Sequence, residues 1–252
     1  MYDLQKASMW KRISALLCDF IVLSVVVVGM AFVMSTVLGY DTRAAQLENL
    51  SEAYEKEYNV DFDISDKEYQ ALPEDVHTRY ELAMDAFTKD TEANYVYNLL
   101  VNFTFIIVSI SLLVAFLLLE FLIPLLLGNG QTVGKKVFGV AVMREDSVKL
   151  SPVLLFIRAI LGKYTIETMV PVLIILMIYW GVLGFFGTVI LFGMLILQLV
   201  LLFSTKERSA NHDKLAHTVA VDYASQKIFD TPEAMLAYKK RIHAEQVASE
   251  QY

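Results

Sequence analysis

Residues 13–38 read ISALLCDFIVLSVVVVGMAFVMSTVL, a run of 26 residues in which Asp19 is the one charged side chain. The hydrocarbon core of a bilayer is about 30 Å thick, and about 20 residues of α-helix cross it. The run is therefore long enough to span a membrane. It is also longer than the apolar region of a signal peptide, which is usually about 7–15 residues, so we predict an uncleaved anchor.

Two more apolar runs follow. Residues 101–127 contain Glu120 as their only charge, and residues 165–203 contain only Glu167. As a straight helix, the 39 residues of the last run would be about 58 Å long, which is too long for one crossing. We predict that this run folds back at the glycine-rich residues 181–187. A pair of full crossings and a shallow re-entrant hairpin are both open, and both return the chain to the side from which it entered.

The composition agrees with a membrane protein. The chain has 252 residues, of which 56% are hydrophobic, and its mean hydropathy is +0.49. In a soluble domain the apolar residues are fewer and are dispersed along the chain. The single cysteine, Cys18, excludes an intramolecular disulfide, and we interpret it as a small buried hydrophobe. We predict an all-α membrane protein with about four transmembrane helices.

The charges predict the orientation. Residues 41–97 hold 15 acidic and 5 basic side chains, net −10, and the rest of the chain holds 13 acidic and 16 basic, net +3. These 16 cluster before the first run, between the second and third, and after the third. Lys and Arg near segment ends prefer the cytoplasm. We therefore expect a multi-pass protein of the cell membrane with both termini in the cytoplasm and the acidic loop outside.

The acidic loop has helical patterns. Leu47, Leu50, Tyr54 and Tyr58 recur at helical spacing, and residues 65–68, SDKE, have the form of a capping box. We predict two or three helices that form a small external cap. Its acidity is typical of an ordinary solvated surface; the alternative is a field that concentrates cations.

The linker after the second run also contains a helix start. Ser151 can cap a helix whose first turn holds Pro152. Residues 153–163 are too short to span a membrane and carry two cations, so we predict a helix that lies along the cytoplasmic surface.

Two short β-prone stretches, residues 137–143 and 218–221, are predicted to pair, and residues 231–233, TPE, to open a C-terminal helix. The predicted segments are an N-terminus (1–12), a first transmembrane helix (13–38), the acidic helical loop (39–97), a second transmembrane helix (98–127), a linker with its surface helix (128–164), a transmembrane hairpin (165–204) and a tail (205–252).

Two motifs that suggest other chemistry fail on spacing. Residues 130–136, GQTVGKK, have three residues between the glycines where a phosphate loop has four, and no Ser or Thr follows the lysine. His212 and His217 are five apart, whereas a zinc helix has histidines four apart with glutamate after the first. We therefore expect no enzyme, no catalytic residue, no metal, no cofactor and no nucleic-acid partner.

Taken together, several stretches resemble, in the same order, the motifs of the RDD family of membrane proteins, which is named after an arginine and two aspartates. Family members often have three hydrophobic segments and a short first loop, so the acidic loop and the long last run are departures. The resemblance implies that Asp213 is the second aspartate. The matching residues are Arg12 and Asp19 in KRISALLCD (11–19), GQTVGKKVFGV (130–140), Arg158, and HDKLAHTV (212–219).

Ionisable side chains inside a membrane segment are costly and are functional candidates by default. Asp19 lies seven residues beyond Arg12, on the same helix face and about 10 Å deeper. Glu120 lies eight residues before Gly128, about 12 Å in from the same side. Two carboxylates at similar depth cannot both ionise cheaply, so such a pair can exchange a proton for a cation.

The resemblance also implies a function, because some RDD proteins have been proposed to be sodium/proton antiporters. On this hypothesis Asp19 and Glu120 bind Na⁺ or another monovalent cation and protons, and Arg12 or Arg158 tunes them. Four helices are few for a transport pathway, so a homo-oligomer is expected.

Two alternatives stay open. In a structural interpretation, Arg12 reaches toward Asp19 as a buried ion pair, and Lys135, Arg158 and Asp213 complete a network that only fastens the helices. In the other, the chain is a non-transporting membrane adaptor that binds partners through its cap and tail.

Overall fold

The computed structural model describes residues 5–204 and 210–250. The chain forms two compact units, one of residues 1–27 and 112–252 and the other of residues 28–111. We call them the charged unit and the cap unit.

Three continuous helical stretches among the described residues are long and apolar enough to cross a membrane: Met9–Leu38, Thr91–Leu127 and Pro152–Tyr179. Phe20, Val25, Val28 and Phe32 on the first are 63–74% exposed, as expected of side chains that face lipid. The prediction of an all-α membrane protein is thereby confirmed. The elements are α1 (Met9–Leu38); α5 (Thr91–Phe116) with the π-helix η1 (Leu117–Leu122) and α6 (Ile123–Leu127); and α8 (Pro152–Phe156) with the π-helix η2 (Ile157–Met169) and α9 (Val170–Tyr179).

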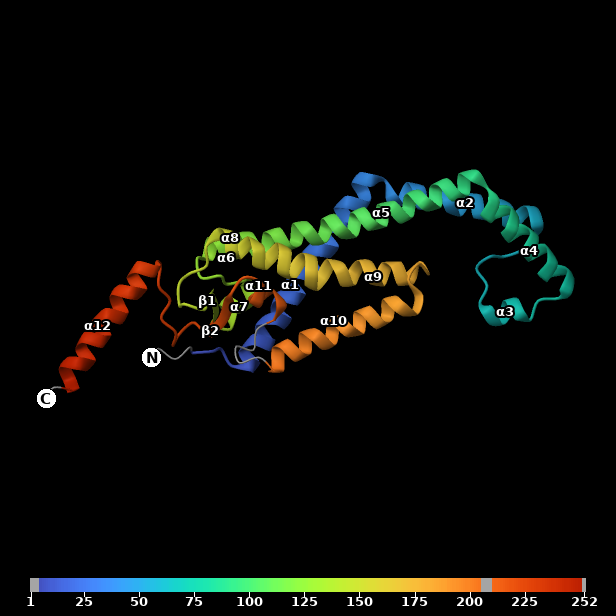
Figure 1. Ribbon diagram of the computed structural model, residues 1–252. Coiled ribbons are helices and arrows are strands. Elements are labelled where there is room, and N and C mark those ends of the chain that lie inside the picture. The colour runs from blue at the N-terminus through green and yellow to red at the C-terminus, as the bar shows by residue number, and fades with distance from the viewer. Residues whose placement is uncertain (1–4, 205–209, 251–252) are drawn as a thin grey trace. The chain divides into compact units, whose positions relative to one another are not determined.

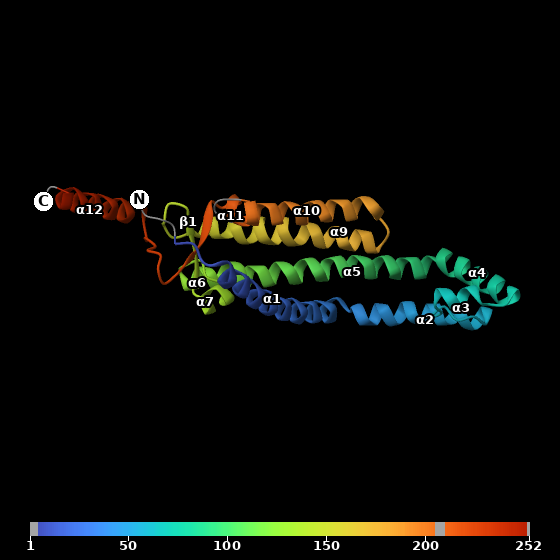
Figure 2. The same ribbon diagram turned by 90° about the horizontal axis from the view of Figure 1, so that it is seen from below.

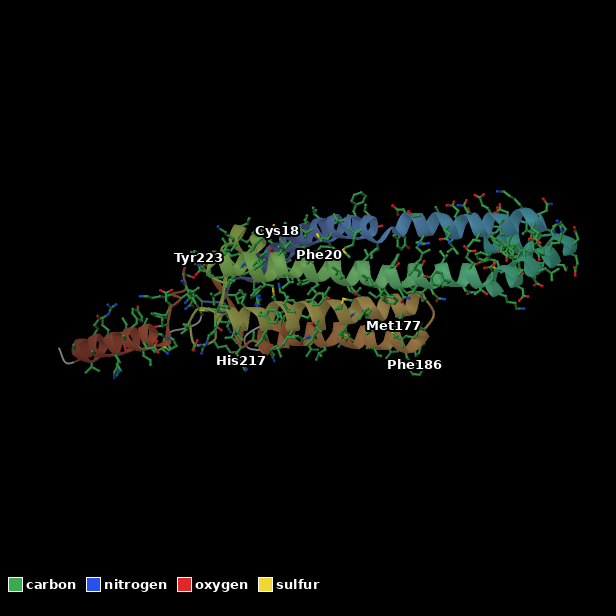
Figure 3. The ribbon with its side chains drawn as sticks, turned by 90° about the horizontal axis from the view of Figure 1, so that it is seen from above. Cys18, Phe20, Met177, Phe186, His217 and Tyr223 are labelled. Carbon is green, nitrogen blue, oxygen red and sulfur yellow. The ribbon has the colours of Figure 1, made fainter. Side chains whose placement is uncertain are left out.

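The predicted hairpin in the last run is present. Helix α9 ends at Tyr179 and α10 (Gly184–Ser204) runs back beside it, as Figures 1 and 2 both show. The turn occupies residues 180–183, slightly before its predicted place. Phe186 projects outward at the turn end of the hairpin (Figure 3) and is 77% exposed. A full crossing by α10 stays a prediction.

The structure differs from the expected surface helix at residues 153–163. The start is as predicted, because the Ser151 hydroxyl accepts from the Leu154 N–H and Pro152 lies in the first turn. The helix then continues unbroken to Tyr179. Its two cations do not require solvent, because Arg158 is buried against Asp213 and the partly buried Lys163 pairs with Glu120.

The predicted strand pairing is also confirmed. Strands β1 (Val140–Arg144) and β2 (Thr218–Asp222) are antiparallel, with Val142 opposite Ala220. One face of this ribbon packs Met143 and Val221 into a small core with Ile228. A one-turn helix precedes each strand: α7 (Val133–Val137) lies before β1, and α11 (Asn211–Leu215) lies before β2.

The cap unit contains the helices predicted for the acidic loop. They are α2 (Tyr40–Tyr58), α3 (Asp66–Gln70) and α4 (Glu74–Lys89), and Ser65 and Glu68 form the predicted capping box. Aromatic rings form the contact between them; Tyr54 packs edge-on against Phe87 at 5.7 Å between ring centroids. The Tyr54 hydroxyl also donates to Asp90, 2.8 Å away.

A C-terminal helix, α12 (Pro232–Glu250), begins where the sequence predicts, with the Thr231 hydroxyl accepting from the Ala234 N–H at 3.2 Å. Its Tyr238 ring packs on Phe229, and the Lys227 ammonium lies 3.8 Å from the centre of that Tyr238 ring.

Candidate functional site

A cavity of about 380 Å³ lies within the charged unit. Apolar side chains of α1, among them Leu16 and Phe20, form part of its wall. All six residues predicted from the sequence to form the site line this cavity. Its charged and titratable lining consists of Arg12, Asp19, Glu120, Lys135, Arg158, Lys163, Glu167, His212 and Asp213.

Asp19 is held by the segment that resembles a phosphate loop. Its carboxylate accepts from the Thr132 hydroxyl and from the Gly134 N–H, at 2.7 Å from the latter, and the Lys135 ammonium lies 3.8 Å away. Gly134 is required for this approach, because a Cβ there would lie 2.3 Å from the Ala15 carbonyl oxygen. The glycine–lysine motif therefore binds a carboxylate of its own chain.

Glu120 is a buried acidic group of this cavity. It sits in η1, is 6% exposed, and accepts from the Lys163 ammonium at 2.5 Å through Oε1. Among the described residues, no donor reaches its other oxygen, Oε2, which is fully buried. A buried carboxylate oxygen without a donor is costly and is a place where a ligand can bind.

The arrangement differs from the expected pair of carboxylates that share a proton. Asp19 and Glu120 line one small space, but each has its own lysine, Lys135 and Lys163. The charge of each carboxylate is therefore balanced locally.

The second aspartate implied by the family resemblance is the centre of a buried ion pair. Asp213 Oδ1 accepts from Arg158 Nε at 3.0 Å and lies 2.9 Å from Arg158 Nη2, with both side chains almost completely buried. Arg12, which we expected to reach toward Asp19, has a guanidinium nitrogen 4.0 Å from Asp213 Oδ2. Burial alone would raise the pKa of Asp213, but the adjacent His212, Arg158 and Arg12 outweigh it and hold this pKa well below its usual range.

His212 and Glu167 form a pair that the sequence analysis missed. Glu167 Oε2 lies 2.8 Å from Nδ1 of His212, and Glu167 Oε1 accepts from the His212 backbone N–H at 3.0 Å. Helix α11 approaches η2 closely here, because a Cβ on Gly162 would lie 2.6 Å from His212 Cβ. Burial lowers the pKa of His212, although Asp213 and Glu167 oppose this effect.

The π-helical geometry explains why three charged residues of the cavity fall on one face. Arg158, Lys163 and Glu167 are spaced by five and four residues within η2. In an α-helix, at 100° a residue, Lys163 and Glu167 would point about 140° and 180° away from Arg158. In a π-helix, with its wider i→i+5 turn, residues four or five apart share a face. Glu120 likewise lies in a π-helix, η1.

Lys135 is crowded by like charges. Its side chain is 12% exposed, and its ammonium also contacts the Thr132 hydroxyl at 3.1 Å. Burial and then the nearby Lys163 lower the pKa of Lys135 from 10.5 to about 7, although Glu120 and Asp19 act in the opposite direction.

This depressed pKa gives a prediction. The folded state binds fewer protons at Lys135 than the unfolded state between pH 7 and 10.5, so stability should rise with pH over that window. Lys135→Gln is expected to flatten the rise, measured by thermal unfolding in detergent from neutral to alkaline pH. The exposed neighbour Lys136 provides the matched control, Lys136→Gln, which should keep it. Parallel curves for wild type and Lys135→Gln would contradict the assignment.

Among the described residues, no group of three or more His, Cys, Asp or Glu side chains is placed to hold a metal ion. The cavity contains four acidic and four basic side chains besides His212. It is therefore close to neutral overall, with its charges arranged as separate ion pairs.

Comparisons with known proteins agree with the motifs. No curated protein and no solved structure matches the chain. The model of the RDD family, however, matches residues 6–217, a stretch that contains every charged residue of the cavity. Together with the three candidate membrane-spanning helices, this match shows that the chain is a membrane protein that belongs to the RDD family.

Proposed function

We propose that this protein exchanges a monovalent cation, such as Na⁺, for protons across the cell membrane. The observation that carries the proposal is Oε2 of Glu120, a buried carboxylate oxygen within a candidate membrane span that has no donor among the described residues. Such an oxygen gains strongly from a bound cation or proton, because it is otherwise desolvated without a donor.

The space beside Glu120 supports binding of one small occupant. A second cavity, of about 10 Å³, lies between Asp19 and Glu120 and is otherwise lined by apolar side chains such as Leu23 and Val133. A cavity needs about 10–15 Å³ to hold one water molecule. A largely dehydrated monovalent cation fits this size and would lie between two carboxylates.

Charge balance supports exchange over simple uptake. Because the acidic and basic side chains of the larger cavity are equal in number, a bound cation leaves a net positive charge in a medium of low dielectric. Loss of a proton from the same cavity restores neutrality. Entry of the cation and release of the proton are therefore expected to be coupled.

The orientation that we propose has both termini in the cytoplasm, the acidic loop (residues 39–97) outside and the chain crossing the membrane four times. The basic residues outside the acidic loop favour this orientation. A homo-oligomer would provide the additional helices that an ion pathway needs.

The experiment is cation-driven proton movement in proteoliposomes with an internal pH dye. Loss of an interaction with a charged group costs about 1.5–3 kcal/mol, and about 1.4 kcal/mol is a tenfold change. We therefore expect Glu120→Gln and Asp19→Asn to slow the sodium-driven proton flux by about tenfold or more. The exposed Glu145 gives the matched control, Glu145→Gln, which should retain the wild-type rate.

Chromatographic profiles establish that each variant is folded before its flux is compared. Full flux in a well-folded Glu120→Gln protein would contradict the proposal.

The alternative function is that of a membrane adaptor. Exposed apolar side chains on α12, Leu236 and Val247, favour a binding role for the tail. On this alternative, removal of α12 abolishes function while the charges of the cavity can be neutralised without functional loss. On the transport proposal, the outcomes are reversed.

A further inference from the structure

Both ring nitrogens of His212 face carboxylates. Nδ1 lies 2.8 Å from Glu167 Oε2, and Nε2 lies 3.5 Å from Asp213 Oδ1. The imidazole is buried, and the backbone hydrogen bond from His212 to Glu167 and the close approach at Gly162 fix its position. Neither contact depends on solvent.

A count of donors shows that this arrangement lacks one proton. A neutral imidazole has one N–H and one lone pair. If the N–H points from Nδ1 to Glu167, at the shorter distance, the lone pair of Nε2 faces an oxygen of Asp213. Two acceptors then oppose one another at 3.5 Å. One additional proton on Nε2 would convert this repulsion into an ion pair.

Other charged groups keep that proton from binding permanently. On η2, Arg158 already donates to the same Asp213 oxygen, and Lys163 lies near Glu167. On α1, Arg12 faces the other oxygen of Asp213. Three cations thus oppose a positive imidazole, and Asp213 and Glu167 favour it. Groups balanced in this way change charge with small changes in their surroundings.

We infer that His212 binds the exchanged proton, between Glu167 and Asp213, at a site separate from the space between Asp19 and Glu120. The inference rests on the proposed function and assigns its two substrates to different places. In the proton-loading step, the Nε2 lone pair forms an N–H bond with a proton of hydronium, whose O–H bond breaks to leave water, and the Nδ1–H bond stays intact. In the release step, the Nε2–H bond breaks, its electron pair returns to nitrogen, and the proton passes to water.

The two places can communicate through η2. Lys163 pairs with Glu120, and Glu167 lies on the same face of η2, four residues further along. An imidazolium beside Glu167 adds positive charge near Lys163 and so disfavours a cation at Glu120. Conversely, a cation at Glu120 favours release of the proton from His212.

The test is a direct titration of the His212 ring by ¹⁵N NMR of the full chain in detergent. The chain has four histidines, so His77→Gln, His217→Asn and His243→Gln leave His212 alone in the spectrum. Asn is chosen at position 217 because the backbone φ of His217 is +49°, and Asn adopts positive φ more readily than most residues. We expect one ring to titrate, with a pKa that burial lowers from its ordinary value, and sodium chloride to shift the midpoint to still lower pH. Choline chloride at equal ionic strength should not shift it.

Transport by His212→Gln provides the second readout. We expect the sodium-driven flux of this variant to lose the pH dependence that the wild type shows. His243 is exposed and provides the matched control, because His243→Gln should keep the wild-type pH dependence. A ring that stays in one protonation state while the protein remains folded, or a titration indifferent to sodium, overturns the inference. Unchanged pH dependence in folded His212→Gln does so as well.

The NMR result also separates the two proposals. A sodium-sensitive His212 in a wild type that transports nothing supports the proton site and contradicts exchange. Flux with a silent His212 supports exchange and places the proton elsewhere.

Discussion

Arg158→Ala is expected to leave little folded protein. The substitution removes the partner that binds Asp213 at 2.9 Å and leaves a carboxylate buried in the charged unit. Breaking a buried ion pair in this way costs about 3–5 kcal/mol, which is a large part of the about 5–15 kcal/mol that stabilises a typical domain. The measurement is thermal unfolding in detergent followed by size-exclusion chromatography.

Arg144 provides the matched control. It forms an ion pair with Asp146 at 2.8 Å, close to the 2.9 Å between Arg158 and Asp213, but the side chains of Arg144 and Asp146 are 39% and 35% exposed. Exposed pairs contribute about 0–1 kcal/mol, so Arg144→Ala should unfold close to the wild-type temperature. If both variants lost the same stability, the Arg158–Asp213 pair would not be the buried anchor described above.

Gly134→Ala is the second substitution with a large expected effect. A methyl group there would lie 2.3 Å from the Ala15 carbonyl oxygen and 2.9 Å from Asp19 Oδ1. Neither is the free end of a flexible chain, so α7 must move away from α1, and the Gly134 N–H would lose Asp19. Overpacking typically costs about 1–3 kcal/mol, and a lost hydrogen bond to a charged group about 1.5–3 kcal/mol. A marked fall in unfolding temperature and loss of flux should follow.

Gly29→Ala tests whether the loss of stability comes from the close contact of Gly134 with α1. Gly29 is also in a helix, and the space around its Cβ position is open to 4 Å. Alanine is favoured over glycine within a helix by about 0.5–1 kcal/mol, so this variant should be as stable as the wild type or more so. A Gly134→Ala protein that behaves like Gly29→Ala would show that α7 does not dock on α1 as described.

Much of the fold could be predicted because its signals are local. The apolar runs, the caps at Ser65 and Ser151, and the β-prone residues near Val142 each depend on a few neighbouring residues. Residues 153–163 are part of a longer continuous helix, whereas their two cations favour a separate surface helix because cations normally indicate solvent. Arg158 and Lys163 are neutralised by residues far away in sequence, and nothing in their own segment reveals that.

The candidate site could be predicted only in part for the same reason. The RDD motifs and the rarity of charges in membrane segments pointed to Arg12, Asp19, Glu120 and others. Lys163 and Glu167 are not predicted as site residues, because the 3.6-residue period of an α-helix would place them on a different face from Arg158. Their spacing of five and four residues is the signal that could have found them, since it fits a π-helix. His212 depends on Glu167, 45 residues earlier, which no local pattern relates to it.

The central claim is that a monovalent cation and a proton compete within the charged cavity, and proton release tests it most directly. Sodium chloride is added to the detergent-solubilised protein in weak buffer near neutral pH, with a pH dye as the readout and choline chloride as the control salt. We expect sodium to release protons in proportion to the protein present, and Glu120→Gln to release far fewer. If folded wild-type protein releases no more protons with sodium than with choline, cation and proton do not compete, and the account is contradicted.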